Sequence, residues 1–172
     1  MGKLNLKIPA FKYKNLPFVE THNVTLEGRA EEFEEQNRQY IEWGYLPENT
    51  AYSQTFDVGS EALAYAETLF PRCSVSIIKQ NPGNTIPSHL DTFYTFCKRH
   101  NVKPDEVIRV NIFLEDWKTG HYLEINENPV LQWKRGDAII ISTDEYHLSG
   151  NMGITPKYTM QVTGVRDEFT GC

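Results

Sequence analysis

The chain changes its hydrophobic period about one third of the way along. From residue 26 to about residue 45, "LEGRAEEFEEQNRQYIEWGY" keeps Phe33 and Tyr40 on one helical side and most glutamates on another. This pattern predicts an amphipathic helix with acidic residues in its first turns, where the helix dipole favours them. A second, shorter helix is predicted in "GSEALAYAETLF", with Ser60 as its cap and Pro71 as its stop.

Short β-branched or alternating stretches follow these helices. Six are typical of strands: "RCSVSIIKQ", "IRVNIFLEDW", "HYLEIN", "PVLQW", "DAIIIS" and "KYTMQVTGV". Strands this short, with Gly, Asn and Pro between them, predict a β-sandwich or barrel. The segment "TFYTFCKRHNVKPDE" fits a short helix or an ordered loop equally well. We expect one domain over residues 1–172, with helices at about 26–70 packed on a barrel at about 72–165.

Composition narrows the classes of partner. The formal net charge is −6, with the acidic excess in "EGRAEEFEEQ", which argues against duplex nucleic acid as a partner. No secretory signal or membrane-length apolar run is present, so we expect a soluble, cytoplasmic protein with no membrane partner. Three widely spaced cysteines, Cys73, Cys97 and Cys172, predict reduced thiols. No feature indicates an oligomeric state.

The stretch "PSHLDTF" raises the possibility of a metal site. His89 and Asp91 are two residues apart, and such residues project to the same face of a strand. A His-x-Asp pair alone is weak evidence in a chain with five histidines. His147, in "STDEYHLSGNMG", follows the apolar strand "DAIIIS" and is the best third candidate. Two histidines and one carboxylate on one side of an ion form the facial arrangement of non-haem Fe(II), which leaves positions open.

A polar strand face strengthens this interpretation. Lys157 lies ten positions after His147 and opens "KYTMQVTG". Alternation places Lys157, Thr159, Gln161 and Thr163 on one face of this strand. If that face points into the barrel, it lines a wet pocket with a cation and a hydroxyl, as a small dicarboxylate requires.

The strand "RVNIFLEDW" contributes two further candidates. Its apolar positions share one face, which is expected to pack, so Arg109 and Asn111 on the other face are predicted to look into the pocket. For Asn111 the alternative is a structural asparagine whose hydrogen bonds are satisfied within the fold.

Three stretches carry a family resemblance. "PGNTIPSHLDTF", "GDAIIISTDEYHLSGN" and "PKYTMQVTG" resemble the Fe(II)- and 2-oxoglutarate-dependent oxygenases, in particular members similar to prolyl and aspartyl/asparaginyl hydroxylases. The resemblance covers about residues 72 to 165. It implies a mainly β fold with N-terminal helices, in which the barrel is a double-stranded β-helix, a cupin-like jelly roll.

The resemblance also implies roles for individual residues. His89, Asp91 and His147 would be the catalytic iron ligands. Lys157 and Thr159 would bind the distal carboxylate of 2-oxoglutarate, with Asn111 as a further cofactor-binding candidate. The family more often has Arg at the basic position, and Lys supplies a point charge in place of a bidentate fork.

The implied activity is hydroxylation of an unactivated C–H bond of an amino acid or peptidyl side chain. It would use Fe(II), 2-oxoglutarate and O2 and release succinate and CO2, with a small-molecule or peptidyl substrate as partner. One alternative is a cupin-like metalloprotein or metalloenzyme without 2-oxoglutarate, which gives Lys157 and Thr159 no shared task. Another is a non-catalytic binding module, which predicts that His89, Asp91 and His147 lie far apart.

Overall fold

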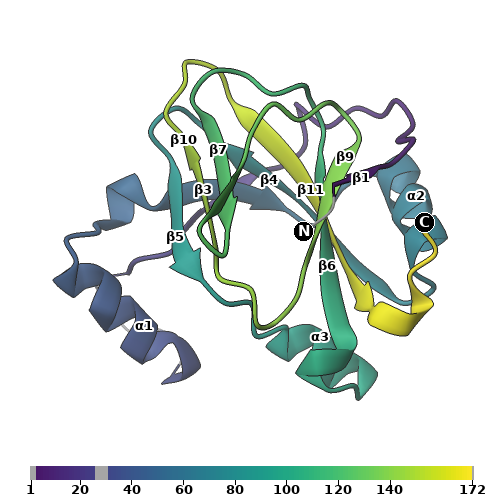
Figure 1. Cartoon of the computed structure of the whole chain (residues 1–172), viewed down its shortest axis with the longest axis horizontal. Helices are drawn as coiled ribbons and strands as arrows, with labels where there is room; N and C mark the ends of the chain where they lie inside the picture. The colour runs from purple at the N-terminus through teal and green to yellow at the C-terminus, as the bar shows by residue number, and fades with distance from the viewer. Residues whose placement is uncertain (1–2, 26–30, 172) are drawn as a thin grey trace.

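Two antiparallel β-sheets face each other and define the fold. The computed structural model describes residues 3–25 and 31–171. Its larger sheet has the strand order β1-β9-β6-β11-β4-β3-β2, and its smaller sheet has the order β5-β10-β7-β8 (Figure 1). From β4 onward the chain changes sheet at every connection except that from β7 to β8. This alternation is the topology of a double-stranded β-helix, or jelly roll, and it confirms the predicted fold class.

The elements have the following bounds. The larger sheet contains β1 (Leu4–Asn5), β2 (Val19–His22), β3 (Ala51–Thr55), β4 (Cys73–Gln80), β6 (Val107–Phe113), β9 (Asp137–Ile141) and β11 (Lys157–Val165). The smaller sheet contains β5 (Thr85–His89), β7 (His121–Ile125), β8 (Asn128–Val130) and β10 (His147–Asn151). The α-helices are α1 (Glu31–Glu42), α2 (Ser60–Leu69) and α3 (Tyr94–His100), and 3-10 turns lie at Pro47–Asn49, Pro104–Glu106 and Arg166–Glu168.

The outer face of the larger sheet carries most of the apolar core. Alternate residues of β4, β6 and β11 pack there against α2 and the N-terminal segment. The buried members from these three strands are Val75, Ile77, Ile108, Val110, Ile112, Tyr158, Met160 and Val162. The remaining alternate residues of the same strands therefore face the space between the sheets.

A second apolar cluster joins residues of the two sheets. Its members are Phe113, Leu123, Ile125, Val130, Trp133, Ile139 and Ile141. The rings of Phe113 and Trp133 stack with their centroids 3.9 Å apart. The polar residues of the inner face thus lie beside two apolar clusters, one on the outer face of the larger sheet and one between the sheets.

The helices occupy different sides of the barrel. Figure 1 shows α1 beside β5, where the Tyr40 hydroxyl donates a hydrogen bond of 2.6 Å to the Ser88 carbonyl. The predicted start of this helix, at residues 26–30, lies outside the described residues. Helix α2 covers the larger sheet and ends before Pro71, as predicted, but its N-cap is Gly59, at φ 79° and without a side-chain cap. The prediction that Ser60 caps the helix is wrong.

The structure also settles the ambiguous segments. Helix α3 shows that "TFYTFCKRHNVKPDE" contains a short helix. Strand β10, at His147–Asn151, is not among the predicted strands; pairing with β5 and β7 on both sides holds this segment extended. Strand β3 was missed because "AYSQT" is short and mostly polar.

Within residues 3–25 and 31–171, Cys73 and Cys97 are free thiols, as predicted. No helix in the same ranges is both long enough and apolar enough to cross a membrane.

We expect Gly164→Ala to lower the free energy of unfolding by about 2 kcal/mol, because overpacking a filled site forces its neighbours to move. A Cβ at Gly164 would lie 2.3 Å from ring carbons of Phe70, which is fully buried. Gly150→Ala is the control, since its Cβ would meet only the Thr85 hydroxyl oxygen, at 3.9 Å. Urea denaturation measures both variants, and equal losses would contradict the packing argument.

Candidate metal centre

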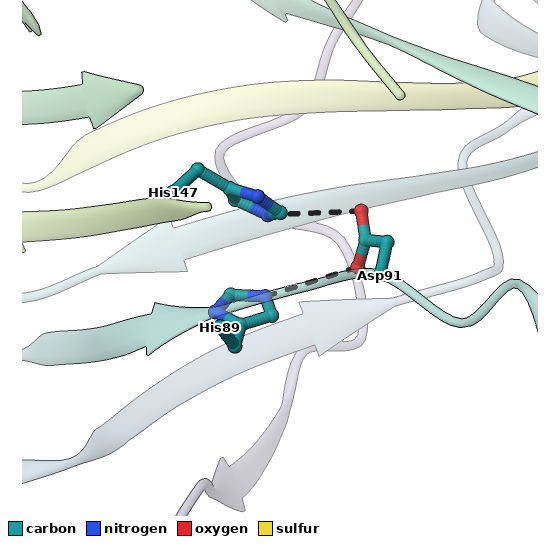
Figure 2. Close-up of side chains that lie close together, drawn as sticks. All are labelled: His89, Asp91 and His147. Atoms are coloured by element: carbon teal, nitrogen blue, oxygen red, sulfur yellow. Dashed lines mark ion pairs between the residues drawn. The ribbon is translucent and has the colours of Figure 1, made fainter. Parts of the chain in front are cut away.

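Three side chains from two neighbouring segments converge inside the barrel. Their ligand atoms, one each from His89, Asp91 and His147, all lie within 4.8 Å of one another. Figure 2 shows both imidazoles pointing toward the carboxylate. The Nε2 atoms of His89 and His147 lie 3.8 Å and 3.6 Å from the Asp91 carboxylate oxygens. The binding-module alternative predicted that these residues lie far apart, and that prediction is wrong.

Strand pairing places the two histidines. His147 is the first residue of β10 and lies directly opposite His89, the last residue of β5, with ring centroids 4.2 Å apart. His147 therefore begins a strand of its own and does not simply end the apolar strand β9. Asp91 lies two residues beyond the end of β5, so the same-face argument that linked it to His89 does not apply.

The hydrogen bonds of the two imidazoles fix their tautomers. His89 Nδ1 lies 2.8 Å from the Pro87 carbonyl oxygen, and His147 Nδ1 lies 3.0 Å from that of Glu145. A carbonyl oxygen only accepts, so each Nδ1 carries the proton and donates. Each Nε2 then keeps its lone pair on the side of the Asp91 carboxylate, as metal ligation requires.

Asp91 is held by an arginine from the facing sheet. Arg109 Nη1 donates to Asp91 Oδ2 at 2.6 Å, and Arg109 Nε donates to the Thr163 hydroxyl at 3.3 Å. The guanidinium also lies over the Phe93 ring, 5.2 Å from its centroid. Arg109 therefore sets the position of Asp91, which follows no strand geometry of its own.

The protonation states of the cluster suit a cation. Burial lowers the pKa of His89 to about 4, helped by the neighbouring His147, and burial also lowers the pKa of His147. Burial alone raises the pKa of Asp91, but Arg109 and the two imidazoles outweigh it and hold that pKa below its usual value. At neutral pH the cluster presents two neutral imidazoles and one carboxylate.

This donor set fits a divalent first-row metal. Ligands about 2.1 Å from an ion lie roughly 3 Å apart when they are adjacent in its coordination shell. The separations of 3.6 and 3.8 Å in the cluster would close to that value with a side-chain movement of less than about 1 Å. Two imidazoles with one carboxylate are the donors of facial non-haem Fe(II) sites.

Two cavities meet at the cluster. An inner cavity of about 420 Å³ lies between the sheets, and an outer cavity of about 890 Å³ opens beside it. His89, Asp91 and Arg109 line both cavities, whereas His147 lines the inner one. Both volumes lie in the range of roughly 300 to 1,000 Å³ that is usual for small-molecule sites.

Asn111 and Thr159 line the inner cavity, as expected from their alternation. Both residues are buried, and neither side chain hydrogen-bonds to any residue within 3–25 or 31–171. Buried polar groups are normally satisfied. Their amide and hydroxyl groups are therefore available to a ligand in this cavity, and the structural role considered for Asn111 is not supported.

Lys157 is buried at one end of this region. Its ammonium donates to Gln80 Oε1 at 3.2 Å, to the Tyr122 carbonyl at 2.7 Å and to the Ser149 hydroxyl at 2.5 Å. It also lies over the Trp133 ring, 5.6 Å from the centroid. Burial lowers the pKa of Lys157 to about 7. Gln80 and Ser149 border the inner cavity, but Lys157 itself is not on its wall.

Sequence reasoning missed the partners of Lys157. Gln80 ends β4 and is the direct neighbour of Lys157 in the β4–β11 pairing. Ser74, Ser76, Ile78 and Gln80 share the inner face of β4, so alternation along "CSVSIIKQ" signals an inward-facing Gln80. Ser149 gave no such signal, because β10 was not predicted as a strand.

We expect the metal-free protein to lose stability as the pH falls from about 6.5 toward about 4. In this window the unfolded chain protonates its histidines, whose pKa is about 6.5, while folded His89 stays neutral to about 4. The free energy of unfolding should fall by up to about 1.4 kcal/mol per pH unit for each such histidine.

Urea denaturation in the presence of a chelator measures this dependence. His89→Asn should make it shallower, because the variant has no imidazole at position 89 to protonate on unfolding. A stability that stays flat between pH 6.5 and 5 would contradict a neutral, buried histidine pair.

No protein-family model matches the sequence, and no curated protein matches it significantly.

Solved structures resemble the chain in outline. A predicted oxalate decarboxylase from Thermotoga maritima is 16% identical, with a TM-score of 0.44, over 67% of this chain and 81% of that one. A cupin protein from Bacteroides fragilis is 14% identical, with a TM-score of 0.42, over 58% and 71%. A protein with a double-stranded β-helix domain from Klebsiella pneumoniae is 16% identical, with a TM-score of 0.40, over 58% and 73%. At these levels function has to be inferred from the residues of this chain.

Proposed function

We propose that the protein is an Fe(II)- and 2-oxoglutarate-dependent oxygenase that hydroxylates an unactivated C–H bond. The observation that carries the proposal is the position of the His89, Asp91 and His147 cluster where two cavities meet. Three protein ligands leave positions open on an ion, and here both an inner and an outer space border the cluster. A co-substrate and a substrate can therefore approach one metal from different sides.

His89, Asp91 and His147 would hold the metal. When bound, Fe(II) together with 2-oxoglutarate and O2 supplies the oxidant that attacks the C–H bond. Arg109 keeps one Asp91 oxygen engaged, which leaves the other free to ligate. The carbonyls of Pro87 and Glu145 keep the imidazoles in the ligating tautomer.

The inner cavity is the proposed co-substrate site. Asn111 and Thr159 offer it polar groups without protein partners, and Lys157 supplies the only ammonium buried beside it among residues 3–25 and 31–171. Apolar side chains complete the wall and limit the entry of water; they are Ile78, Ile86, Leu123 and Ile141. A small dicarboxylate suits such a cavity, because one of its carboxylates would bind the metal and the other would bind the lysine cation.

The outer cavity is the proposed substrate site. Amide and hydroxyl side chains line much of it, among them Gln36, Gln54, Thr92, Thr95, Gln161 and Thr163. Phe56, Leu63 and Tyr94 are exposed apolar side chains on its wall. An amino acid or a peptidyl side chain suits this mixture of amide, hydroxyl and apolar groups.

A metalloprotein without 2-oxoglutarate is the second candidate. The observation in its favour is that all three hydrogen bonds of the Lys157 ammonium go to acceptors within the protein. In that case the lysine has a structural task, and the metal serves another reaction.

We expect anaerobic protein with Fe(II) and 2-oxoglutarate to show the weak visible charge-transfer absorption of a 2-oxo acid chelated to Fe(II). His89→Ala should abolish it, because the site loses one of three ligands, and His22→Ala should retain it. Folded protein that binds Fe(II) but gives no absorption at saturating 2-oxoglutarate would favour the second candidate. Protein that binds no Fe(II) would contradict the metal centre itself.

We expect Lys157→Met to raise the 2-oxoglutarate concentration for half-saturation by roughly 10- to 100-fold, as for the loss of a hydrogen bond to a charged group. Metal affinity should stay within about twofold, because the lysine does not contact the cluster. Lys79→Met, on the opposite face of β4, is the matched control. Loss of metal binding in Lys157→Met would contradict the assigned role.

A further inference from the structure

The arrangement around Lys157 has no vacant hydrogen bond for a ligand. An ammonium carries three N–H donors. They go to Gln80 Oε1, the Tyr122 carbonyl and the Ser149 hydroxyl. A carboxylate can engage Lys157 only if one of these three acceptors gives way.

Gln80 is the acceptor best placed to move. The Tyr122 carbonyl belongs to the backbone of β7, which is fixed by pairing with β10. Ser149 can turn its hydroxyl toward a new acceptor and stay in place. The hydrogen bond to Gln80 Oε1, at 3.2 Å, is the longest of the three, and it ends on a side chain that can rotate.

The Gln80 carboxamide also separates Lys157 from the cavity. Gln80 and Ser149 line the inner cavity, while Lys157 lies behind them. Gln80 Oε1 accepts from both Lys157 and the Ser149 hydroxyl, the latter at 2.7 Å, as one oxygen of a carboxylate would. Gln80 Nε2 in turn donates to the Ser149 carbonyl at 3.2 Å.

We infer that Gln80 occupies the place that the distal carboxylate of the co-substrate takes, and that its displacement sets the affinity and selectivity for dicarboxylates. The inference rests on the proposed function. Rotation of Gln80 frees donors on Lys157 and Ser149, and the unpartnered Thr159 hydroxyl lies on the same cavity wall. A 2-oxo acid without a distal carboxylate has no need to displace Gln80.

Two substitutions test this in opposite directions. Gln80→Glu keeps the shape of the side chain but places a permanent anion on Lys157, so 2-oxoglutarate should bind at least about 100-fold more weakly, through occupancy of the cation and repulsion between like charges. Gln80→Ala removes the competing acceptor, so 2-oxoglutarate should bind at least roughly 10-fold more tightly, in keeping with the loss of one competing hydrogen bond to a charged group. If Gln80→Ala does not fold, Gln80→Met removes the same acceptor at nearly unchanged volume.

The measurement is calorimetric titration of the anaerobic, Fe(II)-loaded protein with 2-oxoglutarate and with 2-oxobutyrate, which lacks the distal carboxylate. Affinity for 2-oxobutyrate should change by less than about threefold in both Gln80 variants, because neither touches the metal ligands. Gln39→Glu is the matched control, since it adds the same charge at an exposed position of α1 that lines neither cavity. It should change 2-oxoglutarate affinity by less than about threefold.

The outcomes separate the two ideas. If the wild-type protein does not bind 2-oxoglutarate, the proposed function fails. If the wild type binds it and Gln80→Glu binds equally well, only the inference about Gln80 fails. If Gln80→Ala and Gln80→Glu both bind more weakly, Gln80 supports the pocket as a structural residue and does not compete with the ligand.

Discussion

An irregularity in β5 brings the candidate metal ligands together. His147 pairs with His89, but Ser149, two residues further along β10, pairs with Ile86, three residues before His89. Strand β5 therefore contains one extra residue, a bulge next to Pro87, where an amide N–H is missing anyway. Because of the bulge, Ile86 and His89 both line the inner cavity, although regular alternation would turn them to opposite faces. Without the bulge, either Ile86 or His89 would point away from the cavity.

The polar interior is tolerated because each of its buried charges has polar or charged partners. Asp91 has Arg109, and Lys157 has three acceptors and an aromatic face. An unpaired buried charge costs several kcal/mol, so each of these contacts is required before any ligand binds. The apolar outer face of the larger sheet is buried under α2, and this burial offsets the free-energy cost of the polar interior. The outer face of these strands thus stabilises the fold, while the inner face of the same strands forms the candidate site.

A feature of the site could be predicted from the sequence where neighbouring residues of the chain determine it, and could not where distant segments do. The inward-facing Asn111 and Thr159 and the outward-facing Met160 follow from alternation within regular strands, and the structure has them so. The β5 bulge and strand β10 depend on partners far along the chain, and "HLSGN" has little strand propensity of its own. The Asp91–Arg109 pair joins a loop to a strand 18 residues away, which no local pattern encodes. Lys157 was placed on the correct face, but its enclosure by Gln80 and Ser149 depends on three strands at once.

Strand β10 links the two halves of the site. His147 and Ser149 are two residues apart and share its inner face, one in the metal cluster and the other beside Lys157. In the pairing with β7 their register is regular, so their separation is fixed by strand geometry. The backbone positions of Ser149 and His147 are therefore tied to each other by one short, paired segment. The distance between the candidate metal ligand His147 and the Lys157 ammonium beside Ser149 is thus set largely by this one strand.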